Sequence, residues 1–149
     1  MWSSAVTTDA EFSISGISAK TLAKDFGTPT FFIDEADFRE RALAWDKALK
    51  DAFGTNAGTV YYASKAFICT ELARWIKDLG IGIDVSTGGE MAVALAGGID
   101  PSKIEVHGNN KSLDEIEKAV SIGVESIIID SLYEIERVAA AAKKVGKVQ

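Results

Sequence analysis

The sequence predicts an α/β fold: a partial TIM (β/α)8 barrel of about four strand–helix units, preceded by an N-terminal strand–helix–strand–helix segment. Three observations lead to this prediction. Apolar, strand-like runs begin at residues 59, 81, 104 and 126, at intervals of 22, 23 and 22 residues. A helical pattern follows each run. At least one glycine stands just beyond each helical pattern, where a left-handed closing residue is favoured.

The N-terminal segment does not follow this repeat. Gly27 can close a first helix, and Pro29 can introduce a strand. Asp34 can cap a long amphipathic helix, whose aromatic residues Phe38 and Trp45 are expected in the core. The expected elements, in chain order, are a strand over residues 12–14, a helix over 18–26, a strand over 30–33 and a helix from 34 to about 52.

The repeating part begins at the first apolar run. Its expected strands cover residues 59–63, 81–85, 104–106 and 126–129, and its expected helices cover 70–79, 90–96, 113–122 and 132–145. Apolar strands that alternate with helices are typical of a parallel sheet covered by helices. We therefore expect residues 29–149 to form the barrel domain and residues 1–28 to form a separate N-terminal segment.

The helix starts support the same units. Three Ser/Thr-x-x-Glu sequences fit the capping box, in which the two side chains bind each other's backbone N–H groups. They are Thr87 with Glu90, Ser112 with Glu115, and Ser131 with Glu134. The first of these makes helix entry a simpler explanation of the Gly88-Gly89 pair than a phosphate-binding turn.

The period calls for a fifth strand where the given sequence ends. Four units do not close a barrel, which needs eight strands and roughly 250 residues. An uncovered parallel edge also favours aggregation. We therefore expect the chain to be the N-terminal part of a longer protein.

Composition argues against several classes of function. The net charge is −6, the isoelectric point is near 4.8, and the basic residues are scattered, so nucleic acid is not an expected partner. The sequence has no long apolar run, so neither a membrane span nor a signal peptide is expected. Cys69 is the single cysteine, which fits a reducing cytoplasm. With His107 as the single histidine, a metal site is not expected either.

Lys65 follows the first apolar run and is a costly residue to bury. Burial destabilises an ammonium ion, which would make the amine available as a Schiff-base nucleophile. Side chains alternate along a strand, so Tyr61, Ala63 and Lys65 would share one face, and the small Ala63 would leave room beside the amine. The plainer interpretation is a lysine whose stem packs while its ammonium group reaches water.

Three more polar residues stand where strands end. In barrels and open parallel sheets, function gathers at the carboxyl ends of the strands. Asp84, His107 and Asp130 occupy such positions, and Asp84 is placed to pair with Lys65 on the neighbouring strand. Each also has a structural interpretation, because aspartates suit βα turns and a lone histidine is no catalytic signature.

Four motifs occur in a fixed order: Phe26-Gly27-Thr28-Pro29, Tyr62-Ala63-Ser64-Lys65-Ala66-Phe67, Asp84-Val85-Ser86-Thr87-Gly88-Gly89-Glu90 and His107-Gly108-Asn109-Asn110-Lys111. Their order and spacing resemble the N-terminal part of the diaminopimelate decarboxylases. That family belongs to the alanine-racemase-like, fold-type III pyridoxal-phosphate enzymes. The resemblance covers about residues 12–149, and the last motif favours this family over its ornithine and arginine relatives.

The resemblance implies decarboxylation of meso-diaminopimelate to L-lysine and carbon dioxide, with pyridoxal 5′-phosphate bound to Lys65 as a Schiff base. It implies a full-length homodimer that acts on a small amino-acid substrate. Lys65 and Asp84 would be the catalytic residues. The residues expected to bind the cofactor or line its pocket are Lys65, Ala63, Asp84, Glu90, His107 and Asn109.

The resemblance also implies parts that this sequence does not contain: a histidine that stacks on the cofactor, a glycine-rich phosphate loop, a glutamate for the pyridine nitrogen and a C-terminal β-domain. The strand over residues 12–14 would belong to that β-domain and have no partner in this chain. We therefore expect little or no decarboxylase activity from the chain alone. Two alternatives stay open: a decarboxylase of ornithine, arginine or another basic amino acid, and a truncated non-catalytic homologue that acts as a scaffold or regulatory partner.

Overall fold

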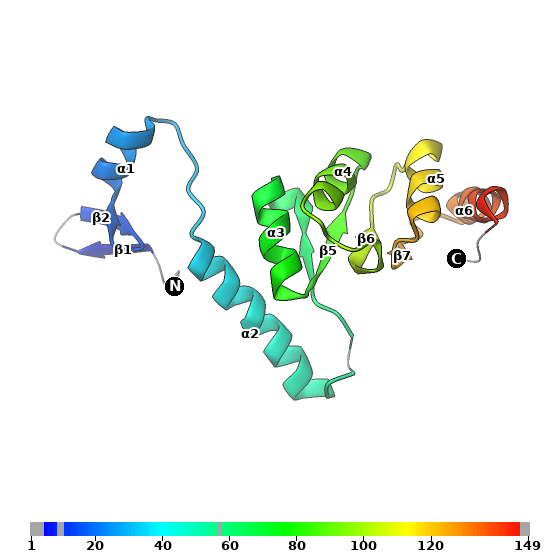
Figure 1. Cartoon of the computed structure of the whole chain (residues 1–149), viewed down its shortest axis with the longest axis horizontal. Helices are drawn as coiled ribbons and strands as arrows, with labels where there is room; N and C mark the ends of the chain where they lie inside the picture. The colour runs from blue at the N-terminus through cyan, green and yellow to red at the C-terminus, as the bar shows by residue number, and fades with distance from the viewer. Residues whose placement is uncertain (1–4, 9–10, 57, 147–149) are drawn as a thin grey trace. The chain divides into compact units, whose positions relative to one another are not determined.

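A computed structural model describes residues 5–8, 11–56 and 58–146 (Figure 1). The chain divides into two compact units, Met1–Ala44 and Trp45–Gln149. The division that the sequence suggested, at residue 28, concerns which residues belong to the barrel domain and stays a prediction. No helix that the structure describes combines the length and the hydrophobicity needed to cross a bilayer.

The first unit contains a small antiparallel sheet, although the sequence suggested only its middle strand. The strand order is β1 (Ala5–Thr8), β2 (Glu11–Ile14) and β3 (Ile17–Ser18). The expected strand over residues 12–14 is confirmed as part of β2. The expectation that it has no partner is wrong, because a turn at Ser15-Gly16, with φ values of 49° and 76°, folds β3 back onto it.

The first helix, α1 (Ala19–Phe26), agrees with the prediction. Ser18 is its N-cap, with Oγ accepting a hydrogen bond from the Thr21 N–H at 3.1 Å. Gly27 follows with a positive φ of 80°, which suits glycine, and its N–H donates to the Ala23 carbonyl. Capping residues at both ends therefore define this short helix.

The predicted strand over residues 30–33 is wrong. The segment pairs with no strand that the structure describes, and a strand exists only through ladder hydrogen bonds to a neighbour. The Thr30 hydroxyl instead donates locally, to the Gly27 carbonyl at 3.0 Å, and the Phe31 side chain is 99% exposed. The apolar pattern of this segment was therefore insufficient to specify a strand.

The long helix α2 (Glu35–Phe53) begins where Asp34 predicted it, since Asp34 Oδ1 accepts from the N–H groups of Ala36 and Asp37. The expectation that its aromatic residues lie in the core is wrong, because α2 has no buried residue among those described and Trp45 is exposed. Ion pairs between residues four apart line the helix, and each such pair contributes about 0.3–0.5 kcal/mol. These local ion pairs, and not the burial of apolar side chains, therefore stabilise α2.

The second unit confirms the repeating part of the prediction. Its described residues form a four-stranded parallel sheet in chain order, with a helix after each strand. The strands are β4 (Tyr61–Ala63), β5 (Gly82–Val85), β6 (Ile104–Val106) and β7 (Ser126–Ile127), and the helices are α3 (Thr70–Leu79), α4 (Gly88–Ala96), α5 (Leu113–Ile122) and α6 (Leu132–Val145). Strands β4 and β7 are each two residues shorter than expected, because β4 begins at Tyr61 instead of residue 59 and β7 ends at Ile127 instead of residue 129.

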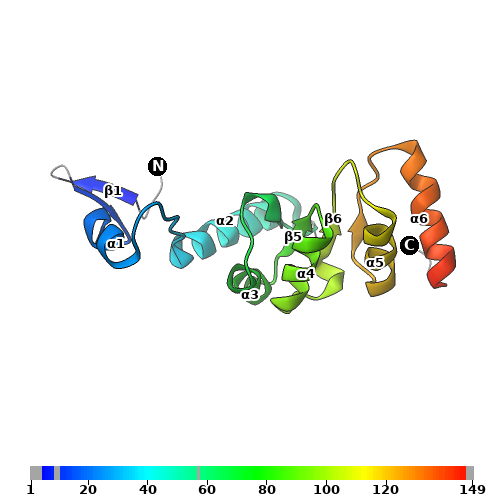
Figure 2. The ribbon, with the colours of Figure 1, turned by 90° about the horizontal axis from the view of Figure 1, so that it is seen from above.

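Alternation along the strands separates two faces of this sheet. On one face, Ile83, Val85, Ile104 and Val106 are buried, and α3 and α4 pack against β5 and against each other (Figure 2). On the other face, strand register aligns Ala63, Asp84, Glu105 and Ser126 in one row. The helices therefore cover an apolar face, while a largely polar row lies on the opposite face.

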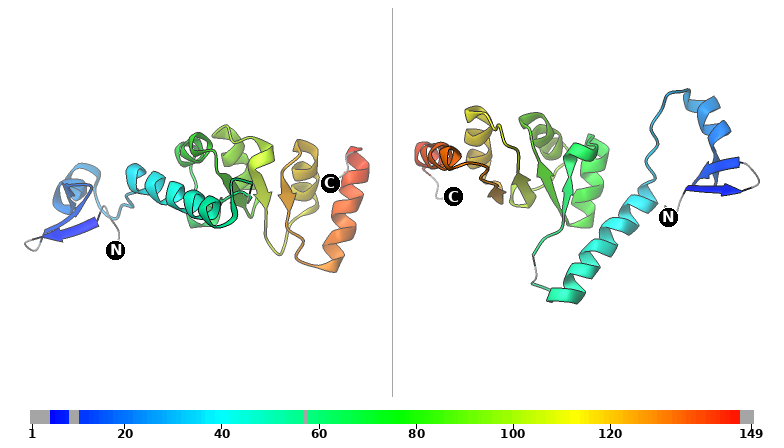
Figure 3. Two further views of the ribbon diagram at one scale, coloured as in Figure 1. Left: turned by 90° about the horizontal axis from the view of Figure 1, so that it is seen from below. Right: turned by 180° about the vertical axis from the view of Figure 1, so that it is seen from behind.

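Helices α5 and α6 lie side by side and form a second apolar cluster (Figure 3). Ile116, Val120 and Ala141 are buried there, and Ile127 and Val138 pack against them. Burying aliphatic side chains of this size stabilises a fold by about 1.5–3 kcal/mol each. This cluster packs the middle of α6 against α5 and against Ile127 of β7.

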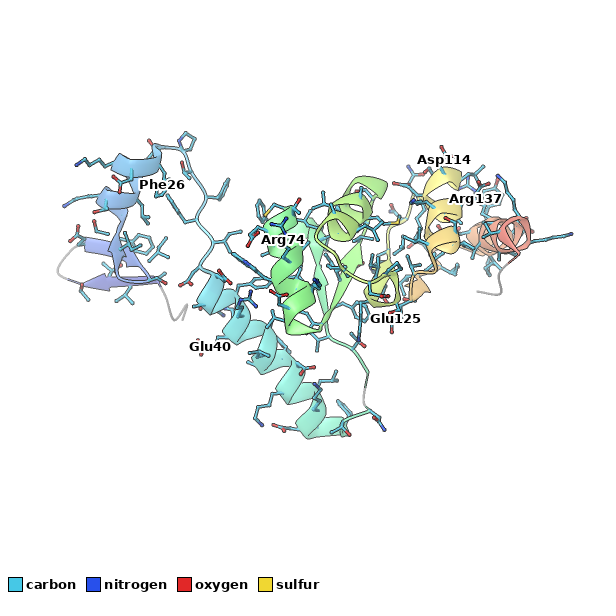
Figure 4. The ribbon with its side chains drawn as sticks, viewed as in Figure 1. Phe26, Glu40, Arg74, Asp114, Glu125 and Arg137 are labelled. Carbon is cyan, nitrogen blue, oxygen red and sulfur yellow. The ribbon has the colours of Figure 1, made fainter. Side chains whose placement is uncertain are left out.

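Tyr61 links the two ends of the sheet at its amino edge. Its hydroxyl donates to Glu125 Oε2 at 2.5 Å, and Glu125 directly precedes β7 (Figure 4). Burial, and then the hydrogen bond to Glu125, raise the pKa of the Tyr61 hydroxyl. The ring lies where a side chain at position 82 would stand, 2.5 Å from an added Cβ, which explains Gly82.

Two glycines at opposite ends of α4, Gly89 in its first turn and Gly97 at its C-cap, are expected to respond in opposite directions to the same substitution. A Cβ at Gly97 would lie 2.3 Å from the Ala73 Cβ, whereas a Cβ at Gly89 would meet only the Thr87 hydroxyl at 3.8 Å. Gly97→Ala should lower the free energy of unfolding by about 1–3 kcal/mol through overpacking. Gly89→Ala should raise it by about 0.5 kcal/mol, because alanine loses less backbone entropy in a helix. Urea titrations measure both values, and equal effects would contradict the close α3–α4 packing.

Candidate functional site

The carboxyl ends of β4 to β7 meet at a cleft of about 390 Å³. Residues from four successive strand–helix loops line it: Lys65, Ser86, His107, Gly108, Asn109 and Asp130. Of the six residues predicted for the site, the cleft brings together Lys65, His107 and Asn109. Asp130, which the sequence places at the end of the fourth strand, lines the same cleft.

Lys65 stands at the cleft, and of the two interpretations that the sequence allowed, the buried strand residue is wrong and the exposed lysine is confirmed. The strand ends at Ala63, and Ser64–Ala66 forms a single 3₁₀ turn, so the alternation of side chains stops before Lys65. The expectation that Tyr61, Ala63 and Lys65 share one strand face is therefore wrong. Lys65 is exposed, which leaves its amine accessible from the cleft.

Asp84 and His107 form an acid–imidazole pair at the ends of β5 and β6. Asp84 Oδ2 lies 3.6 Å from His107 Nδ1, which is an electrostatic contact and too long for a good hydrogen bond. The Asp84 side chain is 13% exposed and that of His107 is 47% exposed. Asp84 Oδ1 is buried and has no hydrogen-bond partner among the atoms that the structure describes. The pairing of Asp84 with Lys65 stays a prediction.

Glu90 acts on the loop before its helix. Its Oε2 accepts from the Ser86 N–H at 2.6 Å, while its own N–H donates to Thr87 Oγ1 at 3.1 Å. Glu90, Ala63 and Asp84 are not among the residues that line the cleft. Glu90 thus holds the backbone of a residue that does line it.

The three expected capping boxes turn out to be of two kinds. The reciprocal box is present at Ser112 and Glu115. In the other two, the glutamate accepts from the residue before the cap: Glu90 from Ser86, and Glu134 from Asp130. The expectation of a reciprocal box at Thr87 and Ser131 is therefore wrong in that detail, although both hydroxyls do cap their helices.

The Gly88-Gly89 pair serves helix entry, as the sequence suggested. The Gly88 N–H donates to Glu115 Oε1 at 2.6 Å, so a side chain of the next unit already binds this helix start. Hydrogen bonds from Ser112 and Gly88 lower the pKa of Glu115 despite its partial burial. An anion at this helix start would have to displace an internal carboxylate.

The buried lysine of this site is Lys111, whose role the sequence did not reveal. Lys111 is 3% exposed and Glu134 is 6% exposed, and Lys111 Nζ lies 3.1 Å and 3.0 Å from the two carboxylate oxygens of Glu134. The same ammonium group donates to the carbonyls of Gly108 and Ile128. The lysine belongs to the fourth motif, but nothing in its spacing to Glu134 indicated an ion pair.

The contacts of this ion pair determine the ionisation of Glu134. Burial raises the pKa of Glu134, but hydrogen bonds from the Asp130 N–H and Lys111, together with the charges of Lys111 and Arg137, outweigh that effect and lower it. Arg137 also donates to the Lys111 carbonyl at 3.2 Å. Glu134 is therefore held as a carboxylate.

Comparison with known families gives a match over most of the chain. Residues 35–148 match the family described as "Pyridoxal-dependent decarboxylase, pyridoxal binding domain". The chain is 50% identical over 136 residues to the diaminopimelate decarboxylase of Mycobacterium tuberculosis, covering 91% of this chain and 29% of that protein. It is 40% identical over 131 residues to that of Staphylococcus aureus, covering 86% and 30%. The chain thus spans about 30% of the length of these relatives.

Solved structures give the same result. The diaminopimelate decarboxylase of M. jannaschii in co-complex with L-lysine matches with a TM-score of 0.83 and 27% identity, over 97% of this chain and 34% of that one. That of Helicobacter pylori complexed with L-lysine matches with a TM-score of 0.69 and 25% identity, over 84% and 32%. These matches confirm an α/β, barrel-like fold.

Acid should weaken the structure through Glu134. Its folded-state pKa lies below the ordinary value of 4.5, so its stabilising effect is present above about pH 4.5 and is lost as the pH falls through the folded pKa. Wild-type protein should be more stable than Glu134→Gln near neutral pH, and this gap should narrow on acidification. Urea midpoints measured from about pH 6 to about pH 3 test this. A stability difference between the two proteins that stays constant or widens in acid would show that the pKa of Glu134 is not lowered.

Proposed function

The chain belongs to the pyridoxal-dependent decarboxylases, by its match to their pyridoxal-binding domain, and from this premise we propose that Lys65 binds pyridoxal 5′-phosphate covalently. The observation that carries the proposal is the position of Lys65. Its accessible amine stands at a cleft to which four successive strand–helix loops contribute side chains. A primary amine in such a cleft is the group that an aldehyde cofactor requires.

The neighbouring residues fit the aldehyde end of this cofactor. Asp84 has a buried oxygen without a described partner, and its other oxygen faces His107, so this part of the site can accept a hydrogen bond. Asn109 adds an amide that can donate and accept. The fit does not extend to a phosphate group at Gly88, because Glu115 already binds that N–H. When bound, pyridoxal phosphate supplies an electron sink for a carbanion.

We assign these side chains the following roles. Lys65 holds the cofactor, and Asp84 places a carboxyl group beside His107. Glu90 fixes the Ser86 backbone that forms one wall of the cleft, and Ala63 keeps the first position of the polar row small. His107 and Asn109 provide polar contacts along the wall formed by the loop after β6.

The proposed reaction is decarboxylation of meso-diaminopimelate to L-lysine and carbon dioxide. Relatives named diaminopimelate decarboxylase, at 50% and 40% identity, support this substrate over ornithine and arginine. Two structural neighbours were crystallised with L-lysine, which would be the product. Because the chain spans about 30% of those relatives, the reaction is proposed for the protein that carries this chain.

The same family supports further proposals about architecture. The four strand–helix units would be the first half of an eight-stranded barrel formed by residues from 29 onward, with residues 1–28 joining a β-domain. The whole protein would be a cytoplasmic homodimer. The parallel sheet in chain order and the limited coverage of the relatives support the barrel.

Borohydride trapping tests the assignment of Lys65. The chain is incubated with pyridoxal phosphate, reduced and digested, and the labelled peptide is identified by mass spectrometry. We expect the label on Lys65, and its loss in Lys65→Arg, because the guanidinium group forms no Schiff base with the aldehyde. Lys118→Arg, at an exposed lysine of α5, serves as the matched control and should label as wild type. Label spread evenly over surface lysines would contradict the proposal.

Substrate choice is tested with the protein that carries this chain. Release of carbon dioxide is measured with meso-diaminopimelate, ornithine and arginine, each in the presence of pyridoxal phosphate. We expect turnover of meso-diaminopimelate to exceed that of the other two by at least about 100-fold, since a site built for a polar group rejects analogues that lack it. Lys65→Ala should reduce turnover to background. Faster turnover of ornithine or arginine would assign the other substrate class.

A further inference from the structure

A buried ion pair stands behind the cleft. Of the charged side chains that the structure describes, Lys111 and Glu134 are the buried ones, 3% and 6% exposed. Desolvating two charges costs several kcal/mol each, and good geometry with additional hydrogen bonds is needed to offset that cost. The extra bonds that this pair makes are therefore informative.

The ammonium group of Lys111 binds two neighbouring strand–helix loops. Nζ donates to the Gly108 carbonyl at 2.7 Å, in the loop after β6, and to the Ile128 carbonyl at 2.6 Å, just after β7. Glu134 Oε2 accepts from the Asp130 N–H at 2.9 Å. Gly108 and Asp130 both line the cleft, so each end of the ion pair holds backbone of the cleft wall.

The loop after β6 is held at both ends of its turn. The His107 N–H donates to the Val85 carbonyl at 2.8 Å, which continues the ladder between β5 and β6. Gly108 then turns the chain with a φ of 107°, close to Ser86: an added Cβ would lie 3.2 Å from the Ser86 carbonyl oxygen. Lys111 fixes the carbonyl of that same glycine. His107 and Asn109 therefore flank the residue that Lys111 holds.

We infer that Lys111 and Glu134 are positioning residues, which set the geometry of His107, Asn109 and Asp130 at the cleft. The pair touches the backbone of the cleft wall from behind and is not itself part of the lining. This inference rests on the proposed function, because the three positioned residues serve a cofactor only if Lys65 binds one. A pair that only stabilised the fold would not need to bind both loops.

Removing both charges tests whether the ion pair positions the cleft residues or only stabilises the fold. Lys111→Met/Glu134→Met leaves no unpaired buried charge, and apolar replacement of a buried ion pair is often neutral or stabilising. The matched control is Lys144→Met/Glu117→Met, which removes an exposed lysine–glutamate pair between α6 and α5. Both double variants are compared with wild type by urea unfolding to confirm that they are folded.

The first measurement uses the single histidine of the chain as a reporter. The imidazole of His107 gives one set of NMR signals, which report its contact with Asp84 without any cofactor. We expect these signals to shift or broaden in Lys111→Met/Glu134→Met and to stay at wild-type positions in the control. Wild-type signals in a folded Lys111→Met/Glu134→Met variant would overturn the inference.

The second measurement is the rate of borohydride-trapped labelling of Lys65 by pyridoxal phosphate. It should fall about tenfold in Lys111→Met/Glu134→Met, since displacing groups of a site by about 1 Å costs one to two orders of magnitude. The control should label at the wild-type rate. If wild-type protein itself is not labelled, the proposed function fails, while the His107 signals still decide the positioning role.

A second variant covers the case in which the apolar pair does not fold. Lys111→Met/Glu134→Gln keeps one oxygen for the Asp130 N–H and leaves no unpaired buried charge, but it removes the ammonium group that holds the Gly108 and Ile128 carbonyls. The NMR signals of His107 should shift in the same direction as in Lys111→Met/Glu134→Met, because the Gly108 carbonyl is no longer held. Unchanged His107 signals in this variant would overturn the inference equally.

Discussion

Every residue that lines the cleft takes its position from the parallel pairing of β4 to β7. Parallel strands place all their carboxyl ends at one edge of a sheet, so loops far apart in the sequence meet there. Lys65 and Asp130 are 65 residues apart in the chain and line the same cleft for this reason. If β5 slipped by one residue, its side chains would exchange faces and Asp84 would turn toward the helices.

Parallel pairing brings the loops together but does not hold their conformation. In three successive units, a glutamate in the first turn of the helix does this by accepting hydrogen bonds from backbone at or before the cap. Glu90 holds Ser86, Glu115 holds Ser112 and Gly88, and Glu134 holds Asp130. The helix start favours a negative charge at this position, so the same residue stabilises the helix and fixes the preceding loop. A repeated capping residue thereby becomes a repeated support for the cleft.

Much of this arrangement could be predicted from the sequence, because it depends on local and periodic signals. The spacing of apolar runs gave the parallel sheet and the four helices that follow its strands, and the motif around Lys65 identified the edge at which the cleft lies. Signals that depend on distant partners were missed. The segment over residues 30–33 has a strand-like composition, but only pairing makes a strand, and the structure describes none there. Trp45 was assigned to a core for its hydrophobicity alone, although nothing in its own helix determines what covers it.

The two lysines show why burial could not be read from sequence. Lys65 follows an apolar strand, so its sequence allowed both a buried and a water-accessible amine, and a 3₁₀ turn directly after the strand places it at the surface of the cleft. Lys111 follows a polar turn, and nothing in its sequence neighbourhood indicated burial, yet it is buried against Glu134. The difference lies in the available partners: Lys111 meets a carboxylate and two backbone carbonyls, which together offset the desolvation of its charge. The accessible lysine is thus free for chemistry, and the buried lysine holds the wall of the cleft in which that chemistry would take place.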